Sequence, residues 1–316
     1  MNLLQKFQMK SRWDETLYMP KGLPGYIFHY TSPVGFESIL FRNSQKIELW
    51  ASRYDCLNDM SEGTLALEIY KEVCSDMREC GEIEGQFYDL IKDVTPAHTM
   101  LMWHKSNGVN TLTVAEYERY ICSFSKNRDS LAMWNYYSKG NMYEGFNLGF
   151  YTRMLEESVN EHLDSYETRI HMYPVAYEKE SQKELIHDFI ANLAECYEEG
   201  DETSVRYTVS NQLVQWSLVF KSEHFKHEEE VRLIVDIGKK PPCSVPQLKV
   251  NYRITKGFTI PYIILEIDKN TLSDVTIGPL LGDIESKRTQ LAVMEERLTT
   301  QDYLALVKGS EIPVRY

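Results

Sequence analysis

Two carboxylates stand two positions apart in the segment FKHEEEVRLIVDI, which covers residues 225–237. In an extended strand, alternate side chains point to the same face and lie roughly 6.6 Å apart. Glu228 and Glu230 can therefore address neighbouring atoms of one substrate as an acid pair. The alternative is a solvated strand edge on which Arg232 pairs with Glu230 and contributes little to stability. The apolar residues at the remaining strand positions are expected to face the core: Val231, Leu233, Val235 and Ile237.

A histidine, a tyrosine and a threonine meet at the end of another predicted strand, in the segment GYIFHYTSPVGFESIL. Strand alternation places His29 and Thr31 on one face and Tyr30 on the other. Ser32 is a natural helix N-cap and Pro33 suits the first helical position, so a helix is expected to follow directly. A strand end beside a helix N-terminus suits a sugar hydroxyl or a phosphate. The alternative is that His29 is an ordinary hydrogen-bonded histidine at a sheet edge.

Small hydroxyls and aromatic rings gather in the segment YICSFSKNRDSLAMWNYYSKG. Ser123 and Ser125 share one face of a predicted strand, and the helix that follows carries several rings. Met133, Trp134 and Tyr137 fall at helical spacing, which indicates that most of these rings belong to the core. An aromatic wall beside small hydroxyls can also stack a base or a nicotinamide, so the segment is a candidate ligand site.

The segment CLNDMSEG places Asn58, Asp59 and Glu62 just before a predicted helix. Helix capping by Asp59 or Ser61 explains these residues better than metal binding, because no histidine accompanies the acids. A metal-dependent phosphoesterase or nuclease that uses Asp59, Glu62 and the cluster at 228–230 is a weaker alternative. Its sign would be carboxylates that converge with metal-ligand geometry.

Positioning these residues requires an irregular alternation of helices and strands. Helical spacing and start or stop signals predict helices in EGTLALEIYKEVCSDMREC, RDSLAMWNYYSKG, SQKELIHDFIANLAECYEEG, TVSNQLVQWSLVF and IESKRTQLAVMEERL. Strands are predicted in YIFHYT, KIELWAS, YICSFS, EGFNLGF, MYPVAY, EEVRLIVDI, YIILEI and SDVTIGP. The unequal spacing favours an α+β fold with mixed or mostly antiparallel sheets over a doubly wound sheet. The one linker candidate, GKKPPCSVPQ, reads as a loop, so residues 1–316 are predicted to form a single α+β domain with helical insertions near 60–100 and 180–220.

Composition restricts the function classes. The 316 residues carry a net charge of −13, from 47 acidic and 34 basic residues, which disfavours broad nucleic-acid binding and anionic membranes. No run of about eighteen apolar residues indicates a transmembrane helix, and the start of the chain does not resemble a secretory signal. The six cysteines have no C-x-x-C pair or metal-ligand spacing, so reduced thiols in a cytoplasmic protein without zinc are expected.

The order of these pieces resembles a bacterial family of proteins of unknown function, DUF2971. Its members show His-Tyr followed by Ile-Leu, Asn-Asp-x-x-Glu, a Cys-x-x-Ser strand before a Met-Trp-x-x-Tyr helix, Gly-x-x-x-Gly-Phe, and Lys-x-x-x-Trp-x-x-Glu-x-Glu-x-Arg. Here the pieces read HYT…SIL, NDMSE, CSFS, MWNYY, GFNLGF and KSEHFKHEEEVR, over most of residues 26–236. Phe225 replaces the family's usual tryptophan, so ring packing is expected to survive while any indole hydrogen bond is lost.

The same order is similar to a distant form of the ADP-ribosyltransferase plan, in which three motifs on separate strands surround NAD. HYTSPVGFESIL resembles the opening His-x-Thr segment of NAD-using toxins, including those that modify DNA. SFS is similar to the Ser-x-Ser strand of the arginine-directed branch, and EEE contains a Glu-x-Glu. The resemblance implies a split ADP-ribosyltransferase-like arrangement of the sheets.

The resemblance also implies roles for the carboxylates and the serines. Cleavage of the nicotinamide–ribose bond passes through a transition state with oxocarbenium character, which a carboxylate stabilises. Glu230 would supply this carboxylate and hold the ribose 2′-hydroxyl, while Glu228 would orient or deprotonate the acceptor. Ser123 and Ser125 would support the Glu230 carboxylate.

The remaining implied roles concern NAD itself, which would be a substrate and the implied cofactor. His29 would hydrogen-bond the ribose on the adenosine side, and Thr31 would position the adjoining ribose or phosphate. Tyr30, Trp134 or Tyr137 would pack the nicotinamide ring.

The sequence therefore suggests an NAD-dependent mono-ADP-ribosyltransferase, in the glycosyltransferase class, or another NAD-consuming effector, such as a toxin or an anti-phage defence protein. Its expected partners are NAD, a protein or nucleic-acid acceptor and an antitoxin, with no membrane. The alternative from another class is a non-catalytic nucleotide-binding or protein-interaction module of the same fold. That alternative predicts an ordinary surface pair of Glu230 and Arg232 with no pocket beside it.

Overall fold

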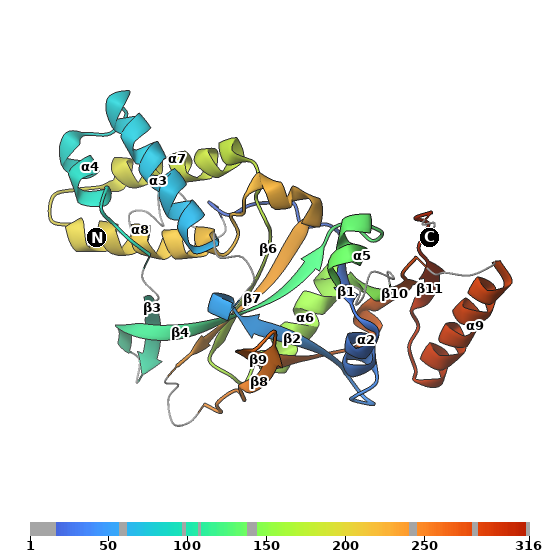
Figure 1. The fold of residues 1–316 in the computed structure, drawn as a ribbon. Coiled ribbons are helices and arrows are strands. Elements are labelled where there is room, and N and C mark those ends of the chain that lie inside the picture. The colour runs from blue at the N-terminus through green and yellow to red at the C-terminus, as the bar shows by residue number, and fades with distance from the viewer. Residues whose placement is uncertain are drawn as a thin grey trace.

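An open, mostly antiparallel sheet forms the centre of the protein (Figure 1). The computed structural model describes residues 17–56, 62–96, 99–106, 109–137, 144–239, 245–279 and 284–313. Within these residues, eleven strands form one sheet: β1 (Tyr26–Thr31), β2 (Ile47–Arg53), β3 (Thr99–Ser106), β4 (Val109–Ser125), β5 (Phe146–Tyr151), β6 (Thr168–Pro174), β7 (Glu230–Gly238), β8 (Asn251–Thr255), β9 (Phe258–Ile267), β10 (Leu272–Ile277) and β11 (Leu306–Gly309). Each strand pairing is antiparallel except that of β10 with β11. The expected α+β fold with mostly antiparallel strands is confirmed.

Helices cover both faces of this sheet. The described α-helices are α2 (Pro33–Leu40), α3 (Glu62–Glu79), α4 (Gly85–Ile91), α5 (Leu131–Tyr137), α6 (Thr152–Leu163), α7 (Lys179–Cys196), α8 (Glu202–Ser217) and α9 (Ile284–Thr300). Figure 1 shows α3, α4, α7 and α8 as one group, at the end of the molecule far from α9 and β11. No helix of the described residues is both long and apolar enough to span a membrane.

The side-chain alternation of β7 serves two hydrophobic cores. Val231, Leu233 and Val235 pack with α2 and α6 on one face of the sheet. On the other face, Ile234 packs with the group of α3, α4, α7 and α8. The apolar positions therefore face a core as predicted, and the opposite face of the strand is covered as well.

The sheet divides at β4. Along one edge, β4 pairs with β7 from Tyr117 to Ser125. On the other edge, its register with β1 covers Ser125, and its register with β2 covers Tyr120 and Ile121. Beyond these contacts, β1 continues to β5, β10 and β11, while β2 continues to β9 and β8. Residues 122–124 consequently have no strand partner on this edge among the described residues.

Local signals explain where α2 begins. Ser32 is the N-cap residue, and its side chain accepts a hydrogen bond of 3.2 Å from the Gly35 N–H, with Pro33 in the first helical position. Both expectations for this helix start are confirmed. Several elements were not predicted from the sequence: α4, α6, β3, β8 and β11.

Candidate functional site

Five residues of the segment KSEHFKHEEEVR form one charge cluster. Arg232 donates from Nε to Glu230 Oε1 at 2.9 Å and from Nη2 to Glu230 Oε2 at 3.0 Å. Lys221 Nζ lies 2.6 Å from Glu228 Oε2 and 3.4 Å from Glu230 Oε2. The same ammonium lies 4.8 Å from the centre of the Phe225 ring, in a cation–π contact. The charged and aromatic positions of this motif are therefore explained by one interacting group of side chains.

The pair formed by Glu230 and Arg232 is buried. Glu230 is 6% exposed and Arg232 is 2% exposed, and Arg232 Nη1 also donates to the Leu218 carbonyl at 2.7 Å, after the end of α8. The alternative of a solvated strand edge is therefore wrong, because the helical group covers this face. Burial alone raises the pKa of Glu230, but Arg232 and Lys221 outweigh burial and lower the pKa to about 2. The carboxylate is consequently ionised at neutral pH.

A left-handed residue connects the two carboxylates. The 3₁₀ helix η2 (Glu223–Glu228) ends here, and Glu229 has φ of 45°, a conformation that non-glycine residues seldom adopt. The end of β4 holds this turn: Ser125 Oγ donates to the Glu228 carbonyl, and the Lys126 N–H donates to the Glu229 carbonyl, each at 2.8 Å. Ser125 therefore supports the backbone of Glu228, whereas Ser123 helps to lower the pKa of the Glu230 carboxyl group.

His29 spans the gap where β1 and β4 separate. Its Nδ1 lies 2.9 Å from the Ser123 carbonyl, and because a carbonyl only accepts, Nδ1 carries the proton. The imidazole meets the Phe124 ring edge-on, with ring centroids 5.6 Å apart. Burial lowers the pKa of His29, although the bond to Ser123 opposes this, so the ring is neutral at pH 7. Its Nε2 is then an acceptor.

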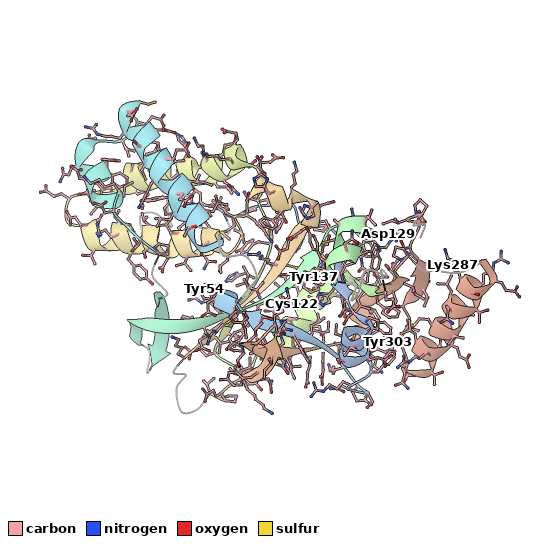
Figure 2. The ribbon with its side chains drawn as sticks, viewed as in Figure 1. Tyr54, Cys122, Asp129, Tyr137, Lys287 and Tyr303 are labelled. Atoms are coloured by element: carbon pink, nitrogen blue, oxygen red, sulfur yellow. The ribbon has the colours of Figure 1, made fainter. Side chains whose placement is uncertain are left out.

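A small cavity of about 20 Å³ lies between β1, β4, α5 and η2. The predicted site residues that line it are His29, Tyr30, Ser123, Tyr137, Glu228 and Glu230. Figure 2 shows Tyr137 near Cys122, where α5 meets β4. Burial and the two carboxylates raise the pKa of the Tyr137 hydroxyl. A cavity of this size holds about one or two water molecules, so a nucleotide can enter only if α5 or η2 moves.

Two of the predicted ring residues brace the loop between β4 and α5. Tyr30 Oη donates to the Asn127 carbonyl and accepts from the Ser130 N–H, both at 2.9 Å. Trp134 Nε1 donates to Asp129 Oδ1 at 2.7 Å, and the two rings meet edge-on with centroids 4.8 Å apart. Tyr30 lines the cavity with its ring, whereas Trp134 is buried and is not among the described lining residues.

Thr31 and Ser125 are also absent from the described lining of the cavity. Thr31 is buried, and its hydroxyl lies where a side chain on Gly35 would stand, so it packs against the first turn of α2. The predicted contacts of Thr31, Tyr30, Trp134 and Tyr137 with NAD stay predictions.

Two residues of the site were missed from the sequence. Lys221 belongs to the family motif, but no role is predicted for it from the sequence. Its position four residues before the Phe225 ring and seven before Glu228 is a pattern that could have indicated a contact with them. Tyr177 carried no signal: its hydroxyl accepts the backbone N–H of Glu230 at 2.9 Å, and burial and the charge of Glu230 raise its pKa.

No cluster of three or more metal-ligating side chains is found among the described residues. Asn58, Asp59 and Ser61 lie outside the described residues, and so does the side chain of Glu62. The expected cap and the weaker metal alternative at this segment therefore stay predictions.

A larger cavity, of about 500 Å³, lies beside the same backbone turn. Tyr177, which holds the Glu230 N–H, is part of its wall, and so is Lys126, which holds the Glu229 carbonyl. Its lining contains positively and negatively charged side chains. Among them, Lys226 and Glu178 form an ion pair with N and O 2.7 Å apart. Both cavities therefore adjoin the segment that carries the carboxylates or the residues that hold its backbone.

The depressed pKa of Glu230 predicts a specific acid sensitivity. The carboxylate has an ordinary pKa of 4.5 and a pKa of about 2 in the folded protein, so its contribution of about 3 kcal/mol to the free energy of unfolding is complete above pH 4.5. That contribution is lost as the pH falls from about 4.5 to about 2. Urea unfolding at a series of pH values is expected to show the wild type losing stability faster than Glu230→Gln in this range. Parallel curves for the two proteins would contradict the prediction.

One comparison with known proteins bears on this cluster. No curated protein and no solved structure gives a match to the chain. One family model does match, and the stretch that it covers contains Tyr137 and the whole charge cluster from Lys221 to Arg232. Residues 133–233 of this chain match the family described as "Protein of unknown function (DUF2971)".

Proposed function

We propose that this protein breaks the bond between nicotinamide and ribose in NAD and transfers the ADP-ribosyl group to an acceptor. One observation carries the proposal: a neutral histidine and two carboxylates, from segments about two hundred residues apart, line one cavity. The division of the sheet at β4, which opens the gap that His29 spans, supports an ADP-ribosyltransferase-like arrangement. A fold likeness alone would not identify a function, so the proposal rests on the site.

The proposed reaction balances with groups that line the cavity. The C1′–N bond breaks, its electron pair leaves with neutral nicotinamide, and the ribose becomes an oxocarbenium ion that a carboxylate of Glu228 or Glu230 stabilises. The acceptor forms a new bond to C1′ and gives its proton to a carboxylate and then to solvent. With water as the acceptor, the products are ADP-ribose, nicotinamide and one proton. The neutral Nε2 of His29 would accept a hydrogen bond from a ribose hydroxyl.

The size of the cavities defines how NAD would bind. The cavity of about 20 Å³ cannot hold NAD, so α5, which carries Tyr137, or η2, which carries Glu228, must move when the ligand enters. The cavity of about 500 Å³ is within the range of small-molecule sites, and its wall contains Tyr177 and Lys126, which hold the backbone of the Glu228–Glu230 turn. It has room for the adenosine half of NAD.

A protein with this activity would act where NAD is available. We place it in the cytoplasm, where the cysteines, which form no disulfide among the described residues, stay reduced. Consumption of NAD or modification of a macromolecule would injure a cell. The proposal therefore includes a role as a toxin or an anti-phage defence protein, with an acceptor and a neutralising antitoxin as partners.

Nicotinamide release by the purified chain tests the proposal. Wild-type protein is compared with Glu228→Gln/Glu230→Gln, which removes both carboxylate charges, in the presence and absence of cell extract as a source of acceptor. Asp236→Asn is the matched control. Asp236 lies on β7, the strand of Glu230, about 20 Å from that residue, and its replacement breaks a buried ion pair with Arg119 of β4, in which N and O lie 2.9 Å apart. Wild type and control are expected to release nicotinamide. The rate of release by the double variant is expected to be at least about 100-fold lower. A folded wild type that releases none under either condition would refute the proposal.

The second candidate is a non-catalytic nucleotide-binding or protein-interaction module. The observation in its favour is that the Glu230 carboxylate is already neutralised by Arg232 and Lys221. Calorimetry on the same wild-type sample separates the two candidates. Binding of NAD without release of nicotinamide supports the module, and binding followed by release supports the enzyme.

A further inference from the structure

Three N–H donors on two cations occupy most of the acceptor positions of the Glu230 carboxylate. Arg232 donates to Oε1 at 2.9 Å and to Oε2 at 3.0 Å, and Lys221 Nζ lies 3.4 Å from Oε2. A carboxylate offers about four lone-pair positions. A ribose hydroxyl that approaches Glu230 would compete with these donors, and displacing Arg232 would separate a buried guanidinium from its carboxylate.

The Glu228 carboxylate is anchored and still open. Its Oε2 lies 2.6 Å from Lys221 Nζ, while its Oε1 has no hydrogen-bond partner among the described residues. The Glu228 side chain is 21% exposed, against 7% for Glu230, and it lines the cavity. One oxygen is thus held and the other is available to a substrate.

The backbone turn makes this division between the carboxylates possible. Glu229, at φ of 45°, separates the end of η2 from the first residue of β7. Ser125 holds the carbonyl of Glu228 at 2.8 Å, and Tyr177 holds the N–H of Glu230 at 2.9 Å. The turn therefore leaves Glu230 beneath the helical group and Glu228 at the more open side.

Lys221 joins the two carboxylates into one unit. It lies between them, and without it two neighbouring carboxylates would repel each other, so that one would take up a proton. Lys221 and Arg232 bring positive charge to both carboxylates. Glu230 then serves as the fixed support on which Lys221, and through it Glu228, is oriented.

We propose that Glu228 is the carboxylate that contacts the substrate in this cavity, and that Lys221, Glu230 and Arg232 are its positioning residues. The assignment rests on the proposed function for the identity of the substrate, and it reverses the roles that the sequence resemblance implied. Glu228 stabilises the positive charge on the ribose during cleavage. Glu230 holds the cluster in place and contacts no substrate atom.

Single substitutions test the assignment through turnover. Glu228→Gln is expected to lower kcat for nicotinamide release at least about 100-fold, with KM for NAD changed less than about threefold. Glu230→Gln, corrected for folded fraction, is expected to lower kcat less than about tenfold, and Glu230→Asp to recover part of that loss. A Glu228→Gln protein with wild-type kcat, beside a folded Glu230→Gln protein that is inactive, would overturn the assignment.

Thermal unfolding distinguishes the two residues without NAD. Glu230→Gln and the control Asp236→Asn each leave a buried arginine without its carboxylate, so both are expected to lower the Tm by roughly 5–10 °C. Glu228→Gln is expected to stay within about 2 °C of wild type, because its side chain is more exposed. Equal losses in Glu228→Gln and Glu230→Gln would contradict the division of roles.

Chemical labelling decides the assignment even if the wild type proves inactive on NAD. A water-soluble carbodiimide activates carboxylates that solvent reaches, and a small amine or Lys221 itself then forms an amide with them. Mass spectrometry is expected to locate the amide on Glu228 and to find Glu230 unmodified. Modification of Glu230 with Glu228 protected would overturn the assignment, whereas a failure of NAD cleavage with labelled Glu228 would refute only the proposed function.

Discussion

Replacing Arg232 by methionine is expected to lower the free energy of unfolding by about 3–5 kcal/mol. Arg232 is 2% exposed and pairs with Glu230 through two hydrogen bonds. Methionine fills a similar volume but removes the partner that holds both oxygens of a buried carboxylate. Glu230 then keeps only the longer ion pair with Lys221, at 3.4 Å, and must take up a proton or draw water into the core. Urea unfolding followed by circular dichroism at pH 7 measures the change.

Two further variants establish that the effect comes from the buried pair. Arg232→Met/Glu230→Gln is expected to recover part of the lost stability, because no unpaired charge remains. Arg153→Met breaks an i, i+4 pair with Glu157 in which the Arg153 side chain is 89% exposed, and it should cost less than about 0.5 kcal/mol. A loss in Arg232→Met no larger than that in Arg153→Met would contradict the prediction.

Replacing Trp216 by alanine is expected to cost about 3–5 kcal/mol. The Trp216 side chain is fully buried in the helical group, meets Phe189 edge-on at 5.4 Å and stacks on Phe220 at 5.9 Å between ring centroids. Its Nε1 donates to the Tyr18 carbonyl at 2.8 Å, which ties the start of the described chain to α8. Alanine removes the contacts of the Trp216 ring with Phe189 and Phe220 and leaves a cavity. Urea unfolding followed by far-ultraviolet circular dichroism measures the loss in the free energy of unfolding.

Trp216→Phe separates the two contributions of this side chain. Phenylalanine keeps most of the ring packing and loses the hydrogen bond to Tyr18, so a cost of about 1–2 kcal/mol is expected. If the alanine variant were no less stable than the phenylalanine variant, ring packing would not be what Trp216 contributes.

The elements around the site were predictable where a local signal was strong. The alternation in YIFHYT and EEVRLIVDI predicted β1 and β7, and Ser32 with Pro33 predicted the start of α2. Helix α6 was missed, although TRMLEESVNEHL follows a strand directly and has no side-chain N-cap at Tyr151. Without a cap or a breaker, the end of a strand and the start of a helix cannot be separated by local pattern alone.

The pairing of side chains within the site was predictable only in part. The Glu230–Arg232 pair followed from their i, i+2 spacing, because both point to one face of a strand. Lys221 lies nine residues before Glu230 in the sequence, and its contact with both carboxylates depends on η2 and the left-handed Glu229. Tyr177, three residues after the end of β6, reaches the backbone of Glu230, a relation that no spacing indicates.

The sequence by itself determined the residue types of this site, the faces of their strands and the cap of α2, because these depend on periods of two and 3.6 residues and on neighbours within one turn. Only the tertiary structure decided that the polar face of β7 is buried, since the covering helices come from residues 62–91 and 179–217. It also decided that, among the described residues, β4 has no strand partner beside Ser123 on the edge away from β7, where His29 crosses the gap. Contacts between distant segments bury Glu230, occupy most of its acceptor positions and leave one oxygen of Glu228 open. A local sequence pattern does not contain such contacts.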